Sequence, residues 1–269
     1  MTKSENGPIP VPPLLNDELL HYRDRLRAAR YAALADAEGF EEICFVVEAF
    51  GIRIYGRQVA MYDYQPLIKE YAVKSPLFDE LVTSCPSFFT KFDALYETLR
   101  LARNDAMHTG TYARHATEAA IELCIGLEDA LMILGTRETV QDFMVKSPME
   151  VESWQPLARA RQLMLMHSFS FLPVKIGSEW KLVSELSLAL YLNTSGKTRK
   201  LRLAQSIDQA IGDKLELVDI LDDNLLVPEQ DIQSVFSSAK VQAGPMLWLV
   251  VNSRTTKRLV GVLSPFELM

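Results

Sequence analysis

Apolar residues in the first half of the chain recur at helical spacing. They step by three and four positions, which places them on one face of a helix. Four such stripes predict a helical bundle. They cover residues 19–33, 43–54, 88–106 and 116–134. The stretch 56–86 contains three prolines, so we expect irregular structure there, with a helix start at Ser75-Pro76.

The second half has a different pattern, in which one order of elements occurs twice. Each copy begins with a helix, continues with two apolar strands joined by a turn, and ends with a second helix. The elements of the first copy cover residues 155–166, 169–176, 180–183 and 185–192. Those of the second copy cover residues 228–239, 246–251, 258–263 and 265–269. The recurrence predicts an internal duplication, whose copies are joined by a polar, basic segment, 193–202.

These repeats resemble the CBS family over about residues 143–269. The segments that carry the resemblance are 145–151, 156–164, 167–174 and 259–268. The resemblance implies two CBS repeats, 143–192 and 204–269, packed as one pseudo-symmetric α/β module with a cleft on either side. It also implies that the module senses an adenine nucleotide, which we expect to be AMP, ATP or a related adenosyl compound.

The resemblance places ligand contacts at the corner where the last strand of each copy meets the following helix. In the family, a Ser or Thr there meets phosphate or ribose, and an acid three positions later binds the ribose hydroxyls. The second copy has Ser264 and Glu267 at these positions, whereas the first has Ser184 and Ser187 and lacks the acid. Pro173 is a further candidate contact. We expect the second corner to bind the ligand; alternatively, Ser264 only caps the last helix and Glu267 is solvated.

The third apolar stripe ends in a polar cluster, Arg103-Asn104-Asp105-Ala106-Met107-His108. Its arginine, adjacent asparagine and histidine resemble the motif of the HEPN family, helical-bundle proteins many of which cleave RNA. The resemblance implies a HEPN-like bundle over residues 15–140 and pairing of two bundles in a homodimer. Four prolines near the start of the sequence predict a flexible tail at 1–14.

Metal-free RNA cleavage requires a group that moves the proton of the 2′-hydroxyl and a fixed cation beside the phosphate. His108 is suited to the first task as general acid or base, and Arg103 to the second. Asn104 lies one helical turn from His108 and would orient the phosphate. In the alternative interpretation, His108 only interacts favourably with the helix dipole, and Arg103 pairs with Asp105 or Glu97.

Composition and charge narrow the function further. Residues 1–142 carry a net charge of −8 and residues 143–269 a net charge of +1, so we expect no DNA partner and only local contact with RNA. No apolar run is long enough to cross a membrane. The three cysteines have no disulfide or zinc spacing, which favours a cytoplasmic location and predicts no metal.

The sequence therefore predicts a chain of class α plus α/β, with a four-helix HEPN-like bundle followed by a tandem CBS pair. The leading functional hypothesis is a cytoplasmic homodimer in which the CBS pair senses an adenine nucleotide and controls a metal-independent RNase. The alternative is a catalytically inactive protein in which the CBS pair serves regulation or dimerisation.

Overall fold

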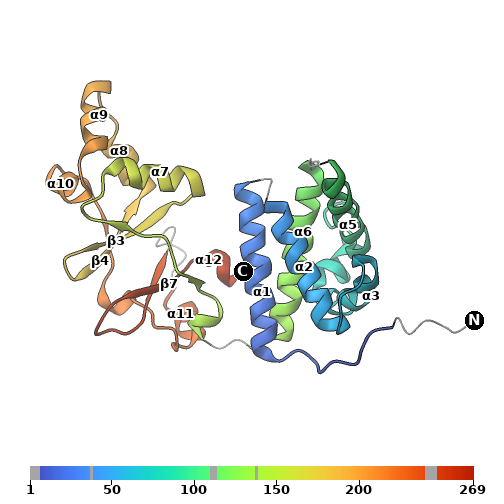
Figure 1. Cartoon of the computed structure of the whole chain (residues 1–269). Coiled ribbons are helices and arrows are strands. Elements are labelled where there is room, and N and C mark those ends of the chain that lie inside the picture. Colours follow the sequence, from blue (N-terminus) through green and yellow to red (C-terminus); the bar gives the residue numbers. More distant parts are fainter. Residues whose placement is uncertain (1–6, 37–38, 110–113, 137–138, 240–246) are drawn as a thin grey trace, which may run out of the picture. The chain divides into compact units, whose positions relative to one another are not determined.

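The computed structural model describes residues 7–36, 39–109, 114–136, 139–239 and 247–269, with the backbone alone for 105–109, 114 and 223. The chain forms two compact units (Figure 1), which we call the helical unit (residues 1–136) and the duplicated unit (residues 137–269). Each unit has its own hydrophobic core. Among the described helices, none combines the length and the apolar character needed to span a lipid bilayer.

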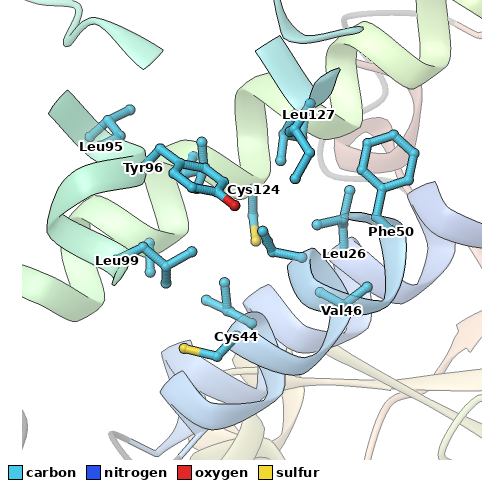
Figure 2. Packing of buried hydrophobic residues seen from close by; sticks show 14 of the residues in the cluster. Leu26, Cys44, Val46, Phe50, Leu95, Tyr96, Leu99, Cys124 and Leu127 are labelled. Atoms are coloured by element: carbon cyan, nitrogen blue, oxygen red, sulfur yellow. The ribbon is translucent and has the colours of Figure 1, made fainter. Parts of the chain in front are cut away.

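Four long helices build the helical unit at the positions of the four predicted stripes. They are α1 (Asn16–Ala35), α2 (Phe40–Tyr55), α5 (Phe92–Thr109) and α6 (Arg114–Leu134). Helix α1 packs on α2 and α6, and α5 packs on α6. Figure 2 shows side chains from all four helices meeting in one core, among them the buried Leu26, Phe50, Leu99 and Leu127. The prediction was wrong for Phe88, which precedes α5 and is 83% exposed.

The proline-containing stretch between α2 and α5 is more helical than predicted. It contains α3 (Met61–Ala72), with Pro66 inside the helix, the short helix η2 (Pro76–Phe78) and α4 (Glu80–Ser84). Helix α3 forms despite the proline because its apolar residues are buried at helical spacing; they are Met61, Tyr64, Ile68 and Ala72. The predicted helix start is confirmed, since the Ser75 hydroxyl accepts a hydrogen bond from the amide of Leu77 at 3.1 Å.

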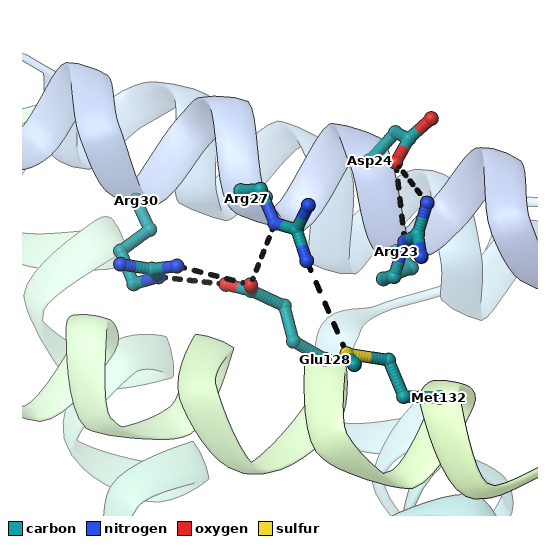
Figure 3. Close-up of polar contacts among 6 residues, drawn as sticks. All are labelled: Arg23, Asp24, Arg27, Arg30, Glu128 and Met132. Atoms are coloured by element: carbon teal, nitrogen blue, oxygen red, sulfur yellow. Dashed lines mark hydrogen bonds and ion pairs between the residues drawn. The ribbon is translucent and has the colours of Figure 1, made fainter. Parts of the chain in front are cut away.

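Buried charges lie between α1 and α6 of the helical unit (Figure 3). The Glu128 carboxylate accepts two hydrogen bonds from Arg30, at 2.7 and 3.1 Å, and lies 3.6 Å from Nε of Arg27. Arg23 is also buried, and its guanidinium donates two hydrogen bonds to the adjacent Asp24. The buried arginines of α1 are therefore accompanied by carboxylates, as buried charges require.

The duplicated unit confirms the predicted repeat of elements. The first copy consists of α7 (Leu157–His167), β3 (Phe171–Ile176), β4 (Glu179–Ser184) and α8 (Glu185–Tyr191). The second copy consists of α11 (Ile232–Ser238), β6 (Trp248–Val251), β7 (Leu259–Leu263) and α12 (Pro265–Leu268). In both copies the two strands form an antiparallel hairpin.

Each hairpin is completed by a strand that precedes the other copy. Strand β1 (Val145–Lys146) leads into the first copy but pairs with β7, and β5 (Val218–Asp219) leads into the second copy but pairs with β4. Strand β2 (Val151–Glu152) lies parallel to β3. The resulting sheets have the strand orders β2-β3-β4-β5 and β1-β7-β6. The two copies therefore exchange strands.

The strand registers establish which residues correspond in the two copies. The strand pair Val145–Val262 is equivalent to the pair Val218–Leu182. In the same way, the pair Val151–Val174 is equivalent to the pair Leu226–Val250. The amide of Ile207 donates a hydrogen bond to the carbonyl of Gln155, and the amide of Val140 donates the equivalent hydrogen bond to the carbonyl of Gln230. Residues 150–155 therefore correspond to 225–230, and residues 174–175 to 250–251.

The basic segment that joins the copies is largely helical, which the sequence did not predict. It contributes α9 (Gly196–Ala204), and α10 (Ile207–Gly212) follows. Helix α9 buries none of its own residues, but Arg202 anchors it, with its guanidinium 4.4 Å from the centroid of the Tyr191 ring. The Tyr191 hydroxyl, which has a single proton to donate, lies 2.6 Å from Oε1 of Gln205 and 2.8 Å from a carboxylate oxygen of Asp213. This cluster connects α8, α9 and α10.

Candidate functional site

The predicted ligand corner of the second copy forms a capping box between β7 and α12. Ser264 has an extended backbone and Pro265 occupies the first turn of the helix, which fixes the start of α12. One oxygen of the Glu267 carboxylate accepts hydrogen bonds from the Ser264 amide at 2.7 Å and from its hydroxyl at 2.6 Å. The Ser264 hydroxyl accepts a hydrogen bond from the amide of Phe266 at 3.2 Å. The structure thus brings Ser264 and Glu267 together, with the carboxylate engaged in capping.

The corner of the first copy has the same cap without a charge. The Ser184 hydroxyl accepts a hydrogen bond from the Ser187 amide at 3.0 Å, and the two hydroxyl oxygens are 2.8 Å apart. The Ser187 hydroxyl also lies 3.0 Å from the carbonyl of Ser184. Pro173 is buried in β3, opposite Leu182, and so lies two positions along the sheet from this corner. The acid three positions after the serine is present at the second corner and absent from the first, where Glu185 directly follows Ser184. Glu267 is 6% exposed, so the alternative that it is solvated is wrong.

The structure describes the side chains of only two of the three predicted RNase residues, Arg103 and Asn104. Arg103 of α5 donates a hydrogen bond to Glu48 of α2 at 2.8 Å, and the two side chains are 31% and 15% exposed. Glu97, one of the partners expected for Arg103, pairs with Arg100 instead. Asn104 is exposed on α5, and His108 lies outside the residues whose side chains the structure describes. Among the described side chains of the motif, Arg103 is therefore held by an ion pair. Its partner, Glu48, lies 55 positions away in the sequence and was not predicted.

Two of the three cysteines, Cys44 and Cys124, are buried in the helical unit. Burial raises the pKa of the Cys44 thiol to about 12, and burial raises the pKa of Cys124 well above its ordinary value. Both thiols are therefore protonated at neutral pH and are poor nucleophiles. Within the described part of the chain, no group of three or more His, Cys, Asp or Glu side chains is placed to hold a metal ion.

A cavity of about 190 Å³ lies in the duplicated unit, away from both corners. It is formed by residues before and in β2, by the β3–β4 hairpin, and by the start of β7. The lining residues are Glu150, Val151, Glu152, Lys175, Trp180, Arg258 and Leu259. The sequence carries no local signal for this cavity, because three separate segments of the chain build it.

Comparison with known proteins gives matches among solved structures alone. No model of a protein family matches the sequence, and the search of curated proteins gave no match. The structure of CBSX2 in complex with AMP is 16% identical and matches 49% of this chain and 93% of that one, with a TM-score of 0.37. A CBS-domain protein from Bacillus anthracis is 17% identical over 48% of this chain and 88% of its own, with a TM-score of 0.37. One from Agrobacterium tumefaciens is 13% identical over 50% and 92%, with a TM-score of 0.36.

Proposed function

We propose that the duplicated unit is a tandem CBS pair that binds an adenine nucleotide and thereby regulates the helical unit. The observation that carries this proposal is the corner of the second copy, where a hydroxyl and a carboxylate meet 2.6 Å apart at the start of a helix. The exchange of strands between two copies of one motif, together with the sequence resemblance over residues 143–269, supports the assignment to the family.

The chemistry of the corner suggests how a nucleotide would bind. A ribose offers two neighbouring hydroxyl donors, which are good partners for the Glu267 carboxylate. In the structure the Ser264 hydroxyl donates to that carboxylate. A bound ribose would take over this interaction, and the Ser264 hydroxyl would then be available to the ligand. The neutral pair Ser184 and Ser187 has no equivalent anion, so we assign the ligand to the second corner.

Calorimetric titration of the full chain with AMP, ADP, ATP, NAD and S-adenosylmethionine tests the proposal. We expect one of these to bind, and a concentration of 100 times Kd to stabilise the fold by about 2.7 kcal/mol. Glu267→Gln keeps the size of the side chain but removes its charge, and should weaken binding at least tenfold. Ser187→Ala at the other corner is the matched control and should bind normally. Absence of heat with all five compounds, or the opposite pattern in the two variants, would contradict the proposal.

For the helical unit, we propose HEPN-like RNase activity in which His108 moves the proton, Arg103 stabilises the phosphate and Asn104 orients it. The pair with Glu48 holds the Arg103 guanidinium in place, and its remaining N–H groups can contact an anion. The same pair also supports the second candidate, a catalytically inactive regulatory protein, because Glu48 neutralises the charge of Arg103.

RNA cleavage in the presence of a chelator distinguishes the two candidates. If the unit is an RNase, His108→Ala and Arg103→Ala should each reduce the rate at least 100-fold. Arg100→Ala is the matched control, because Arg100 lies on the same helix, pairs with Glu97 and has no proposed role. No cleavage of any RNA by the unaltered protein would support the inactive candidate.

A homodimer is the third part of the proposal. Exposed apolar side chains gather on α7 and α8, which contact each other: Leu165, Met166, Leu186 and Leu190. Apolar residues grouped in this way are typical of protein interfaces. Light scattering should give the mass of two chains for the unaltered protein and of one chain for Leu186→Glu combined with Leu190→Glu. An unchanged mass in the double variant would place any dimer contact elsewhere.

A further inference from the structure

The cavity in the duplicated unit combines four charged side chains with an apolar wall. Two of the charges are acidic, Glu150 and Glu152, and two are basic, Lys175 and Arg258. Among the ion pairs of the described residues, none involves any of these four side chains. Both kinds of charge are therefore available to a ligand.

The wall of the cavity is held in place by both sheets. Glu152, Lys175 and Trp180 are successive neighbours across β2, β3 and β4, so their side chains share one face of the sheet. The Lys175 amine lies 5.7 Å from the centroid of the Trp180 ring. The indole N–H of Trp180 donates a hydrogen bond to the carbonyl of Lys257 at 2.7 Å, which fixes the ring against the hairpin of the second copy.

The second copy shows that the fold does not require these charges. By strand register, Glu150 and Glu152 correspond to Leu225 and Val227, and Lys175 corresponds to Val251. All three apolar counterparts belong to the core between the sheets, or pack against it: Leu225, Val227 and Val251. The same backbone positions are thus filled by apolar side chains in one copy and left polar and open in the other. Glu150 and Glu152 are exposed and Lys175 is half-buried, so a ligand can reach all three.

We propose that the cavity binds a small zwitterion of the α-amino-acid class. Its ammonium group would lie between Glu150 and Glu152, and its carboxylate on the guanidinium of Arg258, which is suited to bidentate contact. Trp180 is only 5% exposed, so the apolar part of the ligand would lie mainly against Leu259, which is half-buried. The four lining charges sum to zero, as do those of such a ligand. At about 190 Å³ the cavity is smaller than the roughly 300–1,000 Å³ of sites for drug-sized ligands, which favours a small ligand.

One electrostatic observation agrees with a bound cation. Burial and the neighbouring carboxylate of Glu152 raise the pKa of Glu150 above its ordinary value, and the Lys175 ammonium offsets only part of this rise. Like charges held together in this way are stabilised by an ammonium group placed between them. Neither Ser264 nor Glu267 lines the cavity, so this inference does not depend on the nucleotide site.

Calorimetric titration of the full chain with each of the twenty L-amino acids tests the inference. We expect at least one with an apolar side chain to bind, with its amide and its N-acetyl derivative at least tenfold weaker, because each lacks one charge of the zwitterion. Glu150→Gln and Arg258→Gln should also weaken binding at least tenfold. Glu179→Gln and Arg254→Gln are controls, since these exposed charges lie on the same hairpins but outside the cavity.

The inference would be overturned if no amino acid binds at 10 mM, or if the amide and the N-acetyl derivative bind as well as the parent compound. AMP titration of Glu150→Gln is measured in parallel. Normal AMP binding by this variant, with loss of amino-acid binding, would show that the two sites are separate. Loss of amino-acid binding in Glu179→Gln or Arg254→Gln, with Glu150→Gln and Arg258→Gln unaffected, would also overturn the inference.

Discussion

Removal of the Glu128 carboxylate tests how much the buried ion pairs between α1 and α6 stabilise the helical unit. This side chain is 7% exposed and is the acceptor for both hydrogen bonds from Arg30, with Arg27 beside it. Glu128→Ala would leave two largely buried guanidinium groups without this anion. Breaking a buried ion pair in this way costs about 3 to 5 kcal/mol. With a urea dependence of about 2 kcal/mol per molar, the unfolding midpoint should fall by roughly 1.5 to 2.5 M.

The distribution of tryptophan provides the assay. All three tryptophans, Trp154, Trp180 and Trp248, belong to the duplicated unit, so their fluorescence reports its unfolding. Circular dichroism at 222 nm is dominated by the long helices of the helical unit. We expect Glu128→Ala to move the dichroism transition to lower urea while the fluorescence transition stays in place.

A matched control is available on α5. The pair of Glu97 with Arg100 is three positions apart on one helix, and the Glu97 side chain is 43% exposed. Glu97→Ala should change stability by less than about 0.5 kcal/mol. A loss below about 1 kcal/mol in Glu128→Ala, or an equal loss in the two variants, would refute the reasoning that burial makes the Glu128 interactions strong.

Three further outcomes are expected. A Cβ atom at Gly126 would lie 2.2 Å from the ring of Phe78, so Gly126→Ala should destabilise the helical unit by about 1 to 3 kcal/mol in urea; no change would show that the ring moves freely. Burial and the hydrogen bond to the Asp213 carboxylate raise the pKa of Tyr191 from 10 to about 12. The contribution of the protonated Tyr191 to the free energy of unfolding is therefore complete below pH 10 and is lost as pH rises through 12. Urea unfolding over pH 9–12 should show this loss, and Tyr191→Phe should lack it. Trp180→Phe removes the hydrogen bond to the carbonyl of Lys257 and should lower the free energy of unfolding by about 1 kcal/mol. Calorimetry measures this change, and an unchanged melting temperature would contradict it.

Features with a local cause could be predicted from the sequence. Helical spacing located the four long helices, and the recurrence of helix, hairpin and helix located both copies of the duplicated unit. The hydroxyl of Ser75 before a proline correctly indicated a helix start. Pro66 was misleading, because burial of one face of α3 outweighs the loss of a single backbone hydrogen bond.

Features that join distant segments could not be predicted in the same way. Strands β1 and β5 have two residues each, too few for a recognisable pattern, and their partners belong to the other copy. The pairing of Arg103 with Glu48 connects two helices and has no signal in either. The charges of the candidate cavity are equally inconspicuous, since single charged residues near strand ends usually face solvent. At the corner of the second copy, residue types indicated both the cap and a ligand, and only the cap is a local feature.

The exchange of strands between the two copies determines where the chain can be divided. A fragment that ends after α8 would lose β5 and leave the backbone groups along the outer edge of β4 unpaired. A fragment that begins after α9 would expose the edge of β7 in the same manner, for lack of β1. Exposed strand edges promote association between chains. The smallest piece suited to expression or to fusion with another protein is therefore the whole of residues 137–269, and deletion of half of it would leave a fragment prone to aggregation.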